Sequence, residues 1–395
     1  MTQTVAMPIG TRNWQMTSLP PLSLYVHIPW CLKKCPYCDF NSHEKKGELP
    51  EAEYIDALIL DLESALPLIW GRRVVSVFFG GGTPSLLSAQ GLDRLLEAFR
   101  ARLRLHSDAE ITLEANPGTF EIQKFKDYRS AGITRLSIGI QSFNERHLKA
   151  LGRVHDANEA RRAAEIAATT FDTFNLDLMY GLPQQTLEEA LTDVETSLAF
   201  GPKHLSCYHL TLEPNTLFHR YPPDLPDDDL SADMQEQIEQ RLESASFLHY
   251  ETSAFAQPGH HCQHNLNYWG FGDYLGIGAG AHGKLSFHDR IIRQMRYKQP
   301  ASYLSHTAAG TQVQEEHQID LKELPFEFMM NALRLTGGFP VELFTQHTGL
   351  PISRVEKTLQ LAESEGLITR NHEIIAPSPK GQRFLNTLLQ QFLPA

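Results

Sequence analysis

Three cysteines, Cys31, Cys35 and Cys38, lie within a span of eight residues near the start of the chain. Soft thiolates suit both iron–sulfur clusters and zinc. Three thiolates can bind three irons of a [4Fe–4S] cube, which leaves the fourth iron open to a small molecule with amino and carboxylate groups. A structural zinc site is the alternative, and its fourth ligand could be His27 or His43. Under both interpretations, this segment predicts a metal centre.

Other residues that could bind a ligand follow predicted strands. Gly80 to Gly82 have no side chains, so a carboxylate could approach their backbone N–H groups, with the Thr83 hydroxyl beside it. Glu114 could accept hydrogen bonds from both hydroxyls of a ribose, as acids do in dinucleotide sites. Each signal also has a simpler interpretation, because glycine clusters often form turns and most acids are solvated.

Three more polar residues occur in the same half of the chain. Gln141 offers a hydrogen-bond donor and an acceptor together. Arg153 could pair with a carboxylate through two hydrogen bonds, or form a surface salt bridge instead. Asp177 lies among apolar residues, and a buried acid needs a partner. These residues extend the list of candidate binding positions.

A second group of ligand-type side chains occurs later, in His260-His261-Cys262-Gln263-His264. These residues could bind a metal ion, or one of them could ligate haem iron. The alternative is a polar loop that precedes the aromatic pair Tyr268-Trp269.

The pattern from residue 22 to 212 alternates strands and helices. Six strands are predicted, at 22–28, 74–79, 109–113, 134–138, 173–178 and 204–210. Six such units in a row imply a parallel sheet, as a partial (β/α)6 barrel or as an open doubly wound sheet. In both folds the chemistry gathers at the carboxyl ends of the strands. Because five successive strands carry unusual residues there, we expect a single site.

We divide the chain into an N-terminal extension (1–21), the α/β core (22–212), a less regular extension of the core (213–318) and a C-terminal domain (319–395). The last part predicts helices at 325–335, 341–348 and 353–365, a hairpin at 367–375 and a final helix at 379–392. Helices followed by a small β-hairpin resemble a winged-helix domain. Residues 320–395 carry seven Lys or Arg and eight Asp or Glu, which argues against DNA binding.

Composition limits the function further. The 395 residues carry a formal net charge of −12, which does not favour a nucleic-acid partner. The sequence has no apolar run long enough for a bilayer span, and its first twenty residues lack a secretory signal, so we expect a cytoplasmic protein. Five cysteines do not indicate a disulfide framework.

At this point the motifs resemble a known family. Cys31-x3-Cys35-x2-Cys38, with Tyr37 before the last cysteine, is similar to the radical S-adenosylmethionine (SAM) superfamily. The resemblance implies a partial (β/α)6 TIM-like barrel and a [4Fe–4S] cluster held by the three cysteines. It also implies a pocket for SAM. Its lining residues are Tyr25, Tyr37, Gly81, Gly82, Thr83, Glu114, Gln141, Arg153 and Asp177.

Within that superfamily, the chain is similar to the branch of oxygen-independent coproporphyrinogen III dehydrogenases and HemW-type haem chaperones. The dehydrogenases carry a fourth cysteine two places after the third, where this chain has Phe40. The segment from His264 to Trp269 resembles the HNxxYW element of the chaperones, whose histidine is implicated in haem binding.

The resemblance therefore implies a haem carrier that passes haem to acceptor haem proteins, which could include respiratory proteins at the membrane. A reducing electron donor and a homodimer are further expectations. The alternatives are a radical SAM enzyme that decarboxylates coproporphyrinogen III and a zinc-stabilised regulatory protein.

Overall fold

The computed structural model describes residues 14–119 and 122–394, and its centre is a curved sheet of twelve strands. Six of these strands are parallel and neighbours in the sheet. They are β1 (Leu22–Ile28), β4 (Arg73–Gly81), β5 (Arg104–Ala115), β6 (Arg135–Gln141), β7 (Phe174–Tyr180) and β8 (His204–His209). All six strands predicted from the sequence are present.

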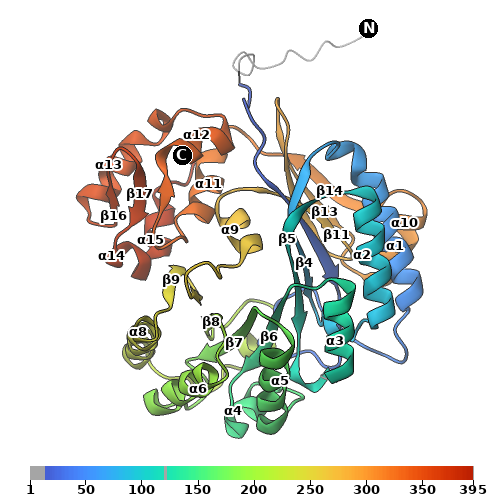
Figure 1. The fold of residues 1–395 in the computed structure, drawn as a ribbon. Coiled ribbons are helices and arrows are strands. Elements are labelled where there is room, and N and C mark those ends of the chain that lie inside the picture. Colours follow the sequence, from blue (N-terminus) through green and yellow to red (C-terminus); the bar gives the residue numbers. More distant parts are fainter. Residues whose placement is uncertain (1–13, 120–121, 395) are drawn as a thin grey trace.

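The crossover helices lie on one side of this sheet (Figure 1). They are α1 (Glu51–Ala65), α2 (Ala89–Arg102), α3 (Ile122–Ala131), α4 (Glu145–Ala150), α5 (Ala157–Thr170) and α6 (Leu187–Ala199). A doubly wound sheet would have helices on both faces, so the architecture is the partial (β/α)6 barrel. Helix α6 begins with a capping box, since Thr186 and Glu189 each accept a hydrogen bond from the other's backbone N–H.

The apolar face of each strand builds the main core. In β1, the alternating residues Leu22, Leu24, Val26 and Ile28 are almost fully buried and belong to the largest apolar cluster, which also contains Leu58 of α1. The intervening side chains of β1 therefore point to the concave, inner side of the barrel. That inner side is where the candidate site lies.

The sheet extends beyond the six parallel strands on both edges, and this extension corrects the prediction of a less regular segment at 213–318. On one edge, β11 (Asp273–Ile277) pairs in parallel with β1 and is followed by β12 (His282–Ser286), β13 (Ile291–Arg296) and β14 (Val313–Gln318). On the other edge, β10 (Ala254–Ala256) and β9 (Leu248–Glu251) follow β8. The glycines at 270–283 hid β11 and β12, because glycine is depleted in strands.

The segment 213–318 also contains the helix α8 (Asp228–Ser244). Asp227 caps it by accepting a hydrogen bond from the backbone N–H of Leu230. Asp227 thus caps the helix, and Asp228 and Asp229 lie in its first turn, where their negative charge interacts favourably with the helix dipole.

The C-terminal domain is winged-helix-like, as predicted. Its helices are α11 (Leu324–Ala332), α12 (Val341–Thr348), α13 (Glu356–Ser364), α14 (Pro379–Arg383) and α15 (Leu385–Gln390). Its small sheet has the order β15 (Phe339–Pro340), β17 (Ile374–Pro377), β16 (Ile368–Arg370). The predicted final helix is therefore two helices, because the backbone at Phe384 is not helical.

A segment near the N-terminus, just before the first strand of the barrel, contacts the C-terminal domain. The Trp14 indole donates to the backbone oxygen of Thr348 (2.9 Å), and Met16 is buried in the apolar core of the C-terminal domain. Residues 1–13 of the predicted extension lie outside the described residues. Within residues 14–119 and 122–394, no helix is long and apolar enough to cross a membrane.

Candidate functional site

The inner face of the parallel strands is polar, whereas barrel interiors are commonly filled by branched apolar residues. The strand register arranges these side chains in layers, because residues paired in parallel strands share a face. One layer contains Tyr25, Phe78, Thr112 and Arg135. The layer nearer the carboxyl ends contains His27, Gly80, Glu114, Ser137 and Asn175. A polar interior of this kind can hold a polar ligand.

The three cysteines lie on the loop between β1 and α1, at the carboxyl end of the first strand. All three are free thiols of intermediate burial, and burial raises the pKa of Cys31 and Cys38. The loop is closed by a short bridge in which Trp30 pairs with His43 and Cys31 pairs with Glu44. The cysteines are therefore held together at the mouth of the barrel.

The ligand geometry differs from that of a zinc site. Within the described ranges 14–119 and 122–394, no three His, Cys, Asp or Glu side chains converge closely enough to hold one metal ion. Three thiolates of a [4Fe–4S] cube bind three different irons, so they need not meet at one point. His27, considered as a fourth zinc ligand, donates its Nε2–H to the Asn41 backbone oxygen (2.9 Å). The donor set, three free thiols on one short loop, fits a cluster of this kind.

Arg153 connects the cysteine loop to the strand ends. Its Nη1 lies 3.6 Å from Cys35 Sγ and 3.5 Å from the Tyr37 hydroxyl. Its Nη2 donates to Asn116 Oδ1 (2.5 Å) and to the Gly139 backbone oxygen (2.8 Å). Arg153 thus links the cysteine loop to the strand ends inside the protein. It does not form the surface salt bridge that was the alternative.

The glycine run approaches the cysteine loop closely. A Cβ atom at Gly82 would lie 2.5 Å from the Trp30 backbone oxygen, and Gly81 has φ of 115°, which L-residues rarely adopt. The Gly81 N–H donates to Glu114 Oε2 (3.1 Å). Thr83 Oγ1 accepts from Asn116 Nδ2 (2.8 Å). The predicted residues from β4 and β5 are thereby brought together with the cysteines.

Asn116 is a residue that the sequence interpretation missed. It connects Thr83 to Arg153 through its two amide atoms. Its position two residues after Glu114, at the end of β5, was the available signal.

Glu114 and Asp177 are the two acids of the inner face near the strand ends. Asp177 Oδ1 accepts from Asn175 (2.7 Å) and Oδ2 accepts from Ser137 (3.2 Å), which supplies the partners that a buried acid requires. Burial raises the pKa of Asp177, and burial followed by the charge of Asp177 raises the pKa of Glu114 to about 8.

This shift predicts a pH-dependent stability for the protein without ligands. Between the ordinary pKa of a glutamate, 4.5, and about 8, native Glu114 keeps a proton that the unfolded chain has lost. Stability from this group is therefore present at low pH and lost as pH rises through that window. In thermal denaturation from pH 5 to pH 8.5, Glu114→Gln should lose less stability than the wild type. Parallel melting curves for the two proteins would contradict this assignment.

Gln141 lies at a bulge at the end of β6, where its φ is 68°. A Cβ atom at Gly139 would lie 2.9 Å from Gln141 Nε2, 3.0 Å from Asn116 Oδ1 and 3.4 Å from Arg153 Nη2. The absence of a side chain at Gly139 thus lets three polar groups meet at the strand end.

We expect Gly139→Ala to weaken SAM binding by roughly tenfold or more, because the new methyl group displaces Gln141 and Asn116, and ~1.4 kcal/mol is enough for that loss. Equilibrium dialysis with labelled SAM measures the effect. Gly118→Ala is the matched control, since its Cβ would meet no atom closer than 3.8 Å. Equal SAM affinity in all three proteins would remove Gly139 and its neighbours from the pocket.

His264 lies deeper in the barrel, on α9 (Gln263–Trp269), which lies on the inner side of the sheet (Figure 1). Its ring is buried, 4.9 Å from the ring of Phe78 and 6.3 Å from that of Tyr25. Its Nδ1 is 3.0 Å from Ser76 Oγ, which is 2.8 Å from Ser23 Oγ. Within the described chain, no hydrogen bond engages its Nε2.

Burial, and then the charge of Arg135, lower the pKa of His264 to about 3. The imidazole is therefore neutral at pH 7, which is the form that ligates metals. For Nε2 to ligate iron, Nδ1 must carry the proton and donate it to Ser76. The His264 side chain thus has the charge state of a metal ligand, and Ser76 is placed to hold its ring through Nδ1.

The neighbours of His264 are engaged differently. Cys262 is buried and its thiol donates to Glu110 Oε1 (3.4 Å). The rings of His261 and Tyr250 meet edge to face at 4.6 Å, and His260 Nδ1 lies 3.5 Å from Thr173 Oγ1. These residues do not converge with His264 on one point.

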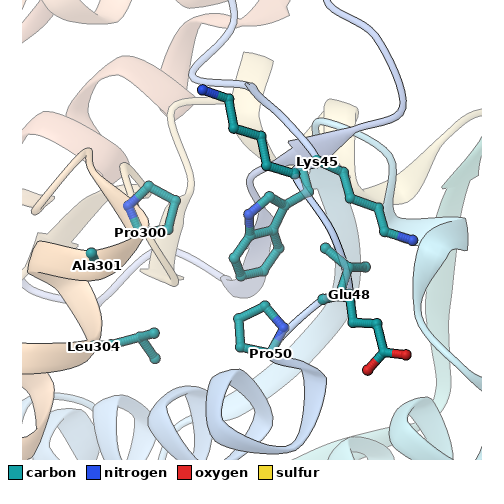
Figure 2. A pocket seen from close by; sticks show the side chains of 9 residues that line it. Lys45, Glu48, Pro50, Pro300, Ala301 and Leu304 are labelled. Carbon is teal, nitrogen blue, oxygen red and sulfur yellow. The ribbon is translucent and has the colours of Figure 1, made fainter.

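A pocket of about 220 Å³ lies beside the cysteine loop, where Lys45, Glu48 and Pro50 face Pro300, Ala301 and Leu304 of α10 (Pro300–Ala308) (Figure 2). The backbone N–H of Lys45, one of its lining residues, donates to the Cys31 backbone oxygen (2.8 Å). Trp30, another lining residue, also belongs to the cysteine loop, so the pocket adjoins the candidate site. Its lining residues are Trp30, Lys45, Lys46, Glu48, Leu49, Pro50, Pro300, Ala301 and Leu304.

A partial (β/α)6 barrel with three cysteines after its first strand and polar residues at its strand ends defines the class of radical SAM proteins. The model of the Radical SAM superfamily matches residues 25–196, and the model of the HemN C-terminal domain matches residues 319–384. Both matches confirm the resemblance inferred from the motifs.

Relatives narrow the class. The chain is 50% identical over 380 residues to "Heme chaperone HemW" of Escherichia coli (strain K12), with 96% of this chain and 100% of that protein covered. It is 49% identical over 384 residues to the protein of the same name from Haemophilus influenzae, with 96% and 99% covered. The chain therefore belongs to the HemW family.

A solved structure has the same fold. Coproporphyrinogen III oxidase (HemN) from Escherichia coli, a radical SAM enzyme, superimposes with a TM-score of 0.80 over 95% of this chain and 90% of that chain. At 24% identity, this similarity supports the fold alone.

Proposed function

We propose that this protein is a haem chaperone, which binds haem and transfers it to acceptor haem proteins. The observation that carries the proposal is its near-complete coverage by relatives called heme chaperones, at 50% and 49% identity. His264, a neutral buried imidazole beside aromatic rings, gives the proposal a chemical basis.

The residues at the barrel mouth fit a [4Fe–4S] cluster with SAM. Cys31, Cys35 and Cys38 would hold the cluster, which supplies a redox-active centre with one iron open to SAM. Gly81 and Gly82 let His27 and the Trp30 backbone pack closely beside the strand end, because Cβ atoms there would lie 2.6 Å from His27 Cε1 and 2.5 Å from the Trp30 backbone oxygen.

The other side chains of the mouth would orient SAM and exclude water. Glu114 would accept from the ribose hydroxyls, while Arg153 and Gln141 would fix polar groups at the strand ends. Thr83 is held by Asn116, and Asp177 is held by Asn175. Tyr25 and Tyr37 would form the apolar walls. The Tyr25 hydroxyl donates to His27 Nδ1 (3.0 Å), which fixes its ring.

Haem would occupy the inner side of the barrel next to the SAM pocket, with His264 as its ligand. Ser76 would orient that ligand through Nδ1. We expect Ser76→Ala to weaken haem binding by about tenfold, since outer-shell partners of metal ligands carry 10–100-fold effects. Titration of the Soret band measures this change. A variant that binds haem as tightly as the wild type would show that Ser76 does not orient the ligand.

A radical SAM coproporphyrinogen III dehydrogenase is the second candidate, because the fold matches HemN. Phe40 argues against this second candidate, because a phenyl ring cannot replace the thiol of the fourth cysteine that those enzymes carry at this position. That ring is 59% exposed on the cysteine loop, so it fills no apolar core.

One anaerobic experiment separates the two candidates. The protein with a reconstituted cluster is incubated with SAM and a reductant, together with haem or with coproporphyrinogen III. A carrier takes up one haem per chain and leaves coproporphyrinogen III unchanged. Catalytic conversion of coproporphyrinogen III with formation of 5′-deoxyadenosine would overturn the proposal in favour of the enzyme.

We also propose a location and partners for this protein. We place the protein in the cytoplasm, with a reducing electron donor for the cluster and acceptors that include membrane-associated respiratory proteins. A homodimer belongs to the same proposal, and analytical ultracentrifugation with and without the cluster measures it.

A further inference from the structure

Arg135, the first residue of β6, is a buried cation that the described residues leave incompletely paired. Its side chain is 3% exposed and its Nε and Nη1 atoms have no hydrogen-bond partner within residues 14–119 and 122–394. The Glu110 carboxylate is the anion recorded in an ion pair with it, at 4.0 Å from Nε. The hydroxyl of Thr112, paired with Arg135 across the strands, also lacks a partner.

The Glu110 carboxylate accepts its hydrogen bonds from groups other than Arg135. Its Oε1 accepts from the thiol of Cys262 (3.4 Å) and from the backbone N–H of His264 (3.3 Å), so it anchors the start of α9. A guanidinium has five N–H donors, and leaving them buried without acceptors is costly. A ligand with an anionic group would supply the acceptors that this guanidinium lacks.

The position of Arg135 indicates which ligand. Arg135 shares its layer of the barrel with Tyr25, Phe78 and Thr112. The His264 ring packs against Phe78 and Tyr25 of that layer, and the charge of Arg135 acts on His264. The ligand must therefore combine a group for an imidazole with a carboxylate for a guanidinium.

We propose that Arg135, assisted by the Thr112 hydroxyl, binds a propionate carboxylate of the tetrapyrrole that His264 ligates. This inference rests on the proposed haem-carrier function and assigns the part of the ligand that gives it orientation. A guanidinium–carboxylate pair in an enclosed site is strong and directional, so it selects tetrapyrroles that keep their acidic side chains.

The test compares haem with haem dimethyl ester, which has the same iron and ring without the free carboxylates. The wild type should bind haem roughly tenfold or more tightly than the ester, as a charge-assisted hydrogen bond implies. Arg135→Gln should lose this preference by weakening haem binding alone, whereas His264→Ala should weaken binding of both ligands. Arg135→Lys, which keeps the charge, should retain part of the preference and guards against a folding defect.

The outcomes are distinguishable. Equal preference for haem over its ester in wild type and Arg135→Gln would overturn the assignment of Arg135. Loss of SAM binding in Arg135→Gln with the haem preference intact would assign the arginine to the SAM carboxylate instead. A wild-type protein that binds neither haem nor the ester would overturn the proposed function, and this inference with it.

Discussion

Replacement of His264 by alanine is expected to weaken haem binding by about 100-fold or more, because the neutral imidazole is the proposed iron ligand and outer-shell changes alone cost 10–100-fold. Its ring is buried against Phe78 and its Nδ1 lies 3.0 Å from Ser76 Oγ, so the substitution removes the imidazole from that position. Anaerobic Soret titration gives the affinity, and the shift of the Soret band reports the change of ligand.

His260→Ala and His261→Ala are matched controls, because they remove neighbouring imidazoles that lie outside the inner layer. Both variants should bind haem within about threefold of the wild type, which is a difference of less than ~1 kcal/mol. If one of the controls loses haem while His264→Ala retains it, the ligand assignment moves to that residue.

The second large effect is expected for the cluster. Cys35→Ser should lose most of its iron and acid-labile sulfide after anaerobic reconstitution, since a hydroxyl is a poor ligand for soft metals. The substitution also changes the contact between Cys35 and Arg153, the residue that links the cysteine loop to the strand ends. Iron and sulfide analysis, together with the visible absorption of the cluster, measures the loss.

Cys207→Ser makes the same chemical change in β8, away from the cysteine loop, and should keep a full complement of iron and sulfide. Iron content that is unchanged in both variants would mean that the three cysteines do not hold the cluster.

The barrel and its mouth were predictable because their signals are local. Alternating apolar residues marked β1. The glycines and threonine at 80–83 and the polar residues at 114, 141 and 177 lie at the ends of strands whose parallel order brings those ends together. The short spacing of the cysteines placed the cluster loop. The resemblance of the motifs supplied the cofactors and the proposed role of His264.

Other parts depend on contacts between distant segments, which periodicity does not report. Asn41 joins the cysteine loop to the backbone oxygens of Ala279 and Lys298, more than 200 residues away. The glycine at 280, with φ of 81°, makes room for that contact, since a Cβ there would lie 2.1 Å from Asn41 Nδ2.

The most important residue of the inner face that the sequence did not reveal is Arg135. It lies within the strand predicted at 134–138, where the pattern of the sequence does not distinguish a buried cation from a solvated one. Only the register, which sets Thr112 beside it and encloses both in the barrel, turns it into a buried cation.

Haem transfer tests the central claim most directly. Protein loaded with one haem per chain is mixed anaerobically with increasing concentrations of an apo b-type haem protein, and the Soret bands of donor and acceptor are followed. A chaperone predicts one-for-one transfer at a rate that rises with acceptor concentration and then saturates, because the two proteins form a complex. A rate that equals passive haem loss at every acceptor concentration would contradict the account.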